Sequence, residues 1–196
     1  MVDTKKVYFI RGQVVPRIPQ LVKDPAFWIS LLLGGLVGYL APQIHGGTLT
    51  VAEAGNIGIT YASISMGVAT TALVLSLGLP GAERMHRWAN LPEATPGRSM
   101  VSNLVFVLAW SAMCQLALIT YCLALILTVG DVKVFPTDPC LWHRITLGVG
   151  VGLLTYSLFE LRDAITTLVQ VGTVIEAEEQ AAASSPDATD DLNSAA

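Results

Sequence analysis

Four runs of apolar residues, each long enough to cross a lipid bilayer, constrain this 196-residue chain more than any other feature. A hydrocarbon core about 30 Å thick takes about 20 residues of α-helix. Backbone polar groups find no water in lipid, so such runs must be helical. The runs cover approximately residues 26–44, 57–79, 102–129 and 141–161. The sequence therefore predicts an all-α membrane protein with four transmembrane helices.

The composition excludes several other classes of protein. Charged residues make up only 13% of the chain, whereas soluble domains average about 25%. The three cysteines form no Cys-x-x-Cys pair, and the three histidines are scattered, so we expect no metal site and no cofactor. Nucleic-acid binding would require a cluster of basic residues on one face, and the sequence contains no such cluster. Since no hydrolase or phosphate-loop motif is present, we also expect no enzymatic activity and no catalytic residue.

The flanking segments divide the chain further. Residues 1–24 are basic and precede the transmembrane domain of residues 25–163, which includes a polar connection at 81–101. The helical pattern of the fourth run continues as a predicted cytoplasmic extension over 164–180. The acidic, Ala- and Ser-rich tail at 181–196 is predicted to be disordered.

Orientation follows from the positions of Lys and Arg, which concentrate on the cytoplasmic side of membrane proteins. With the N-terminus inside, nine of the eleven basic residues fall on the inner side. Only Lys133 and Arg144 fall on the outer side. The sequence thus predicts a multi-pass protein of the cytoplasmic (inner) membrane, with both termini in the cytoplasm.

Two local signals predict where helices begin. Asp24-Pro25 combines an N-cap residue with the preferred first residue of a helix. Thr50-x-x-Glu53 matches a capping box, which places the start of the second helix near Thr50. This helix is longer than the bilayer requires, so its first turn or two should project beyond the membrane.

The second helix carries small and polar residues at steps of three and four, which places them on one narrow face. They are Glu53, Asn56, Thr60, Ser63, Gly67 and Thr70, called the polar stripe below. Such a face is typical of close helix packing. It also suits the lining of a pore with an acidic ring at its mouth, if several copies assemble. Both interpretations stay open.

Other patterns indicate helix contacts. The pairs Gly34-x-x-x-Gly38 and Gly148-x-x-x-Gly152 favour close approach, within one chain or between chains. Gln115, on one face with Ser111, lies mid-membrane and needs a partner, for which Ser63 or Thr70 are candidates. An apolar seam from Leu158 to Ile175 suits contacts between copies.

Two charged groups lie near the predicted inner face. Arg84, Arg87 and Trp88 are candidates for contact with lipid phosphates or a partner. Glu160, with the neighbouring Arg162 and Asp163, is interpreted as an interfacial charge cluster.

Two functional hypotheses follow. The first is a homo-oligomeric ion-conducting or membrane-permeabilising pore, lined by the polar stripe. The second is a non-conducting scaffold or accessory subunit that docks a cytoplasmic protein. Small four-span proteins with this layout include phage exclusion proteins and membrane effectors of bacterial defence, but layout alone does not define function.

Overall fold

The computed structural model describes residues 14–43, 47–78, 80–90 and 99–184. Within these ranges the regular structure is helical, and no strand is formed. The elements are η2 (Val15–Arg17), α1 (Ile18–Lys23), α2 (Pro25–Leu40), η3 (Ala41–Gln43), α3 (Val51–Gly78), α4 (Gly81–Asn90), α5 (Met100–Val129) and α6 (Leu141–Ala183).

Four helices are long and apolar enough to cross a membrane, as predicted. They are α2 extended by η3 (Pro25–Gln43), α3 (Val51–Gly78), α5 (Val101–Val129) and α6 (Leu141–Ala181). The orientation of the termini and the predicted boundaries of the acidic tail stay predictions. The predicted tail lies largely outside the described residues.

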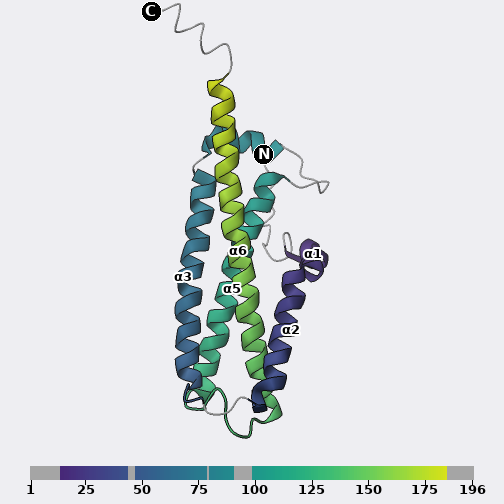
Figure 1. Cartoon of the computed structure of the whole chain (residues 1–196). Coiled ribbons are helices and arrows are strands. Elements are labelled where there is room, and N and C mark those ends of the chain that lie inside the picture. Colours follow the sequence, from purple (N-terminus) through teal and green to yellow (C-terminus); the bar gives the residue numbers. More distant parts are fainter. Residues whose placement is uncertain (1–13, 44–46, 79, 91–98, 185–196) are drawn as a thin grey trace, which may run out of the picture.

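The three long helices α3, α5 and α6 form one bundle, and α2 packs against α6 on its other side (Figure 1). The sixteen residues of α2 span about 24 Å, whereas the 43 residues of α6 span about 64 Å. All four helices reach the end of the bundle that holds the α5–α6 connection, which we call the loop end. Toward the opposite end, α2 is much shorter than the other three helices. The extra length of α3, α5 and α6 therefore lies at the α4 end.

Local capping explains where the helices begin. The Asp24 carboxylate accepts from the Ala26 amide at 2.9 Å. The Thr50 amide donates to Glu53 Oε2 at 2.8 Å, and the Glu53 amide donates back to Thr50 Oγ1 at 3.2 Å. Both predicted starts are confirmed. At the loop end, the Val51 amide also donates to the Val132 carbonyl at 2.8 Å, which ties this start to the α5–α6 connection.

Small residues make the packing face of α3. Its buried residues are Gly55, Ala62, Ser65, Ala69, Ala72 and Ser76. A methyl group added to Gly55 would meet Ile126, and one added to Gly58 would meet the Cys122 thiol, both on α5. The α3–α5 contact therefore depends on the absence of side-chain bulk, as is usual between helices in lipid.

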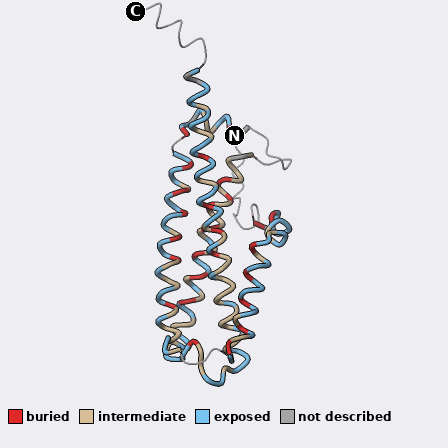
Figure 2. Tube along the Cα trace, viewed as in Figure 1, coloured by how far each residue is buried: buried red, intermediate tan, exposed pale blue. Residues whose placement is uncertain are grey.

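A hydrophobic core lies at the α4 end of the bundle, where Figure 2 shows buried positions along the long helices beyond the start of α2. Its buried members are Ala72, Trp88, Leu104, Leu108, Ala164 and Val171. We call this part the cap. Its helix α4 lies in the segment that the sequence predicted only as a polar connection. The helix begins at Gly81, whose φ of +73° favours glycine.

The cap also accounts for part of the apolar seam on α6. Leu168 and Ile175 pack against the cap core of the same chain. Leu158 and Ile165 stay exposed, at 48% and 47% of their surface. The seam, predicted for contacts between copies, thus divides between contacts within the chain and exposed surface.

Candidate functional site

The polar stripe faces away from the chain's own helices. All six of its residues are exposed. A Cβ atom added to Gly67 would find no neighbour within 4 Å. The stripe begins two positions before the buried series of α3, and two residues correspond to about 200° around a helix. Packing between helices of one chain therefore does not explain it.

Hydroxyl groups on the stripe are partly satisfied by the helix itself. Thr60 Oγ1 donates to the Asn56 carbonyl and Thr70 Oγ1 to the Met66 carbonyl, each at 2.8 Å. Glu53 is held by its capping box with Thr50. In contrast, the side chains of Asn56 and Ser63 form no hydrogen bond within the described part of the chain.

Gln115 is fully buried between α5 and α6, and its partner differs from the two candidates. Its Nε2 donates to the main-chain carbonyl of Ser157 at 3.0 Å. Ser63 and Thr70 cannot serve because they lie on the exposed face of α3. The Gln115 Oε1 and the Ser111 Oγ are buried and have no hydrogen-bond partner among the residues that the structure describes. Neither residue lines the acidic pocket or the apolar groove described below.

The two glycine pairs meet each other within one chain. A Cβ atom on Gly34 would overlap the Gly148 carbonyl oxygen and lie 3.0 Å from the Gly152 amide nitrogen. One on Gly38 would lie 2.7 Å from the Arg144 carbonyl oxygen. Arg144 also donates from Nε to the Gly38 carbonyl at 3.1 Å. The alternative left open by the sequence is thereby settled: the pairs join α2 to α6.

Two of the three candidate lipid contacts on α4 are used inside the cap. Trp88 is only 1% exposed and donates from Nε1 to Glu178 Oε1 at 3.1 Å. Arg84 forms ion pairs with Glu178 and Glu179 at 3.6 and 3.2 Å. Arg87 is exposed, and its nearest acid is Glu83 at 3.6 Å on the same helix. Of the three, only Arg87 is presented to the surroundings.

A polar pocket of about 330 Å³ lies where the α1–α2 junction meets α5 and α6. We call it the acidic pocket, because Asp24, Glu160 and Asp163 all line it. Arg17 closes one side: its guanidinium lies 3.9 Å from the centre of the Phe106 ring and donates to Asn103 Oδ1 at 2.9 Å. The pocket therefore carries both signs of charge, with the acids in excess.

Glu160 is the least exposed acid of this pocket, at 6% of its surface. Its carboxylate interacts with Tyr156 and Trp110, and the nearby charges that act on it are those of Asp24 and Asp163. No ion pair joins it to a cation among the described residues. A buried carboxylate without an ion-paired cation is costly, and the hydrogen bonds from Tyr156 and Trp110 offset part of that cost.

The sequence placed Glu160 in an interfacial charge cluster and missed its burial. The sequence did contain a signal for this burial, because Glu160 lies four residues, about one helical turn, after the aromatic Tyr156. That spacing puts Glu160 on the packed face, whereas Arg162 lies on the exposed one. The burial also depends on α2, whose N-cap Asp24 comes from a distant part of the chain.

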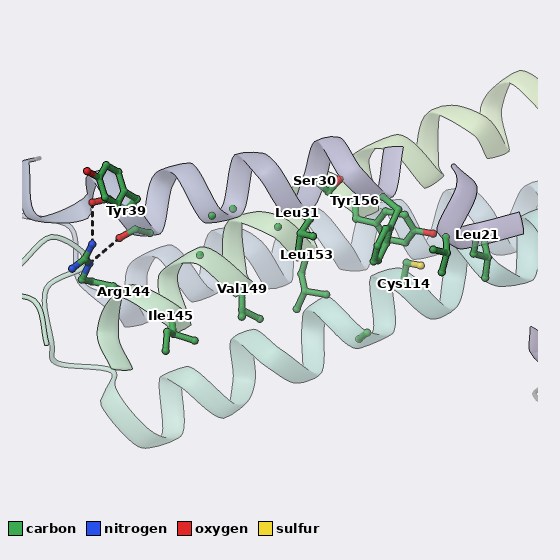
Figure 3. A pocket seen from close by; sticks show the side chains of 18 of the residues that line it. Leu21, Ser30, Leu31, Tyr39, Cys114, Arg144, Ile145, Val149, Leu153 and Tyr156 are labelled. Atoms are coloured by element: carbon green, nitrogen blue, oxygen red, sulfur yellow. Dashed lines mark hydrogen bonds between the residues drawn. The ribbon is translucent and has the colours of Figure 1, made fainter. Parts of the chain in front are cut away.

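An apolar groove of about 950 Å³ runs between α1, α2, α5 and α6. Figure 3 shows Ile145, Val149, Leu153 and Tyr156 in a row along α6, facing this groove. Its floor is the glycine contact between α2 and α6, and Arg144 lies at its far end.

The four spans define a multi-pass membrane protein. No protein family, no curated protein and no solved structure compared with the chain matches it. In the described part of the chain, no group of three His, Cys, Asp or Glu side chains could hold a metal ion.

Proposed function

We propose that the chain forms a homo-oligomeric, ion-conducting pore, with α3 of each copy facing the axis. The observation that carries this proposal is the exposure of the entire polar stripe on a helix of transmembrane length. The opposite face of α3 is already used against α5. A second copy, or water enclosed by several copies, would therefore supply what the stripe lacks.

The chemistry of the stripe is suited to such a path. Asn56 and Ser63 have hydrogen-bonding groups that lipid cannot satisfy. Thr60 and Thr70 need no partner, because their hydroxyl protons bond to the helix backbone while an oxygen lone pair stays available. Glu53 would form a ring of carboxylates at the loop end, which favours cations. Gly67 lies one helical turn after Ser63 and has no side chain to narrow the path at that level.

A direct test is ion flux through liposomes that contain the purified protein. We expect passage of monovalent ions, with a preference for cations that Glu53→Gln weakens. Ser63→Phe should block the flux because it places a ring on the axis. The matched control is Ile64→Phe, at a residue 66% exposed on the neighbouring face. Absence of flux from the unaltered protein at every voltage would contradict the proposal, as would equal effects of the two phenylalanines.

A second candidate is a non-conducting scaffold, and the cap is the observation that favours it. A folded cap with its own core, closed by Trp88 and Glu178, gives a soluble partner a defined surface. In this case Ser63→Phe should have no consequence. Truncation before Glu178 should instead release any protein that copurifies with the full chain.

A further inference from the structure

The apolar groove and the acidic pocket are adjacent. Leu21 and Trp110 line both of them. The pocket lies beside the first turn of α2, and the groove follows α2 from Phe27 to Tyr39. Together they form one amphipathic site, with apolar walls along the membrane-spanning helices and a charged end at the α1 junction. This division matches the two parts of a phospholipid.

The charges of the pocket select among headgroups. Three carboxylates line it, and the most buried of them, Glu160, forms no ion pair with a described residue. An anionic headgroup would be repelled by this excess of acids. A primary ammonium carries a positive charge and three hydrogen-bond donors, and hydrogen bonds between ionised groups are about twice as strong as neutral ones. A choline group carries the charge but has no N–H donor.

We propose that this site binds one phosphatidylethanolamine molecule, with its ammonium group against Glu160 and Asp163 and its acyl chains in the groove. A phospholipid has a negative phosphate beside its ammonium, and Arg17 gives the same pocket a positive side. The lipid belongs to the leaflet at the α1 end. The site lies between α2, α5 and α6, so it does not depend on the pore.

The depth of the groove agrees with one leaflet of lipid. Half of a hydrocarbon core about 30 Å thick is about 15 Å, or about ten residues of helix. Acyl chains that start at Phe27 would therefore end near the level of Leu36. Ala117 on α5 lines this half of the groove and is exposed. Ala124 lies two turns further along the same face of α5 and is exposed outside the groove.

The test is lipid retention by the full-length protein. The protein is reconstituted in vesicles of equal parts phosphatidylethanolamine, phosphatidylcholine and phosphatidylglycerol, then extracted in mild detergent, and the bound lipids are quantified by mass. We expect about one ethanolamine lipid per chain in the unaltered protein. Glu160→Gln should lower its enrichment about tenfold, because a buried charged hydrogen bond is lost. Glu176→Gln, at an exposed acid of the same helix, should not.

A second pair of variants tests the groove. Ala117→Phe should reduce retention of the lipid, whereas Ala124→Phe should leave it unchanged. Equal enrichment of all three lipids, or of the choline and ethanolamine lipids alone, would overturn the headgroup assignment. If Ala117→Phe lowered the number of chains in the native mass spectrum and left lipid retention intact, the groove would hold a second copy, and the proposal would be wrong. Loss of ion flux in Ser63→Phe with normal lipid retention separates this proposal from the pore.

Discussion

Neighbouring glycines on α2 should respond in opposite directions to the same substitution. Gly34 touches the backbone of Gly148 and Gly152, whereas a Cβ atom on Gly35 would meet nothing within 4 Å. An added methyl at Gly34 meets backbone atoms that cannot rotate away, so α2 and α6 must shift apart. Such overpacking costs about 1–3 kcal/mol. At Gly35, alanine instead gains about 0.5–1 kcal/mol of helix propensity.

Both variants gain the same helix propensity, so the expected difference in unfolding free energy between Gly34→Ala and Gly35→Ala is the overpacking cost alone, about 1–3 kcal/mol. For a chain of this size that corresponds to a separation of roughly 2–12 °C in thermal midpoint. The measurement is thermal unfolding of the two purified variants in one detergent, followed by circular dichroism of the helices. Gly148→Ala should resemble Gly34→Ala, since its Cβ would lie 2.8 Å from the Gly34 carbonyl oxygen. A midpoint for Gly34→Ala equal to or above that of Gly35→Ala would refute the direct backbone contact between α2 and α6.

Two further substitutions test the interior of the bundle and the cap. Gln115→Leu should change the unfolding free energy by less than about 1 kcal/mol. A hydrogen bond within a membrane contributes about 0.6 kcal/mol, and the unpartnered Oε1 is removed as well. Gln115→Ala should lower the unfolding free energy by about 2–4 kcal/mol, because it leaves a cavity. A loss in the leucine variant well above about 1 kcal/mol, in denaturant titrations, would show that the amide has a second partner. Trp88→Ala should cost about 3–5 kcal/mol and expose α4 to protease, while Arg87→Ala should stay within about 0.5 kcal/mol. Equal proteolysis of these two variants would contradict the burial of Trp88.

The features that sequence predicted well are local or set by composition. The capping interactions of Asp24 and Glu53 lie within three residues of the groups they satisfy, so their pattern is visible in a short window. The four spans follow from long apolar runs, which a membrane alone can accommodate. The short amphipathic helix α4 was missed because its polar residues outnumber its few apolar ones.

Partners between distant segments could not be predicted in the same way. The glycine pairs were identified, but Gly34 and Gly148 are far apart in sequence, and each pair suits contacts within or between chains. The partner of Gln115 is a main-chain carbonyl, which every residue possesses and no side-chain pattern reveals. Glu160 looked interfacial beside Arg162, and its burial becomes evident only once α2 brings Asp24 against α6.

The polar residues of this membrane domain fall into two sets with different physical requirements. Gln115 and Ser111 are enclosed by the chain itself, so their cost and their partners are decided within one molecule. The polar stripe on α3 and the acidic pocket at Glu160 are not completed by the chain, although each sits on a helix of membrane-spanning length. Lipid hydrocarbon cannot hydrogen-bond to either of them. Since α3 and the α2–α6 groove are separate surfaces, the pore proposal and the lipid proposal can be tested independently of each other.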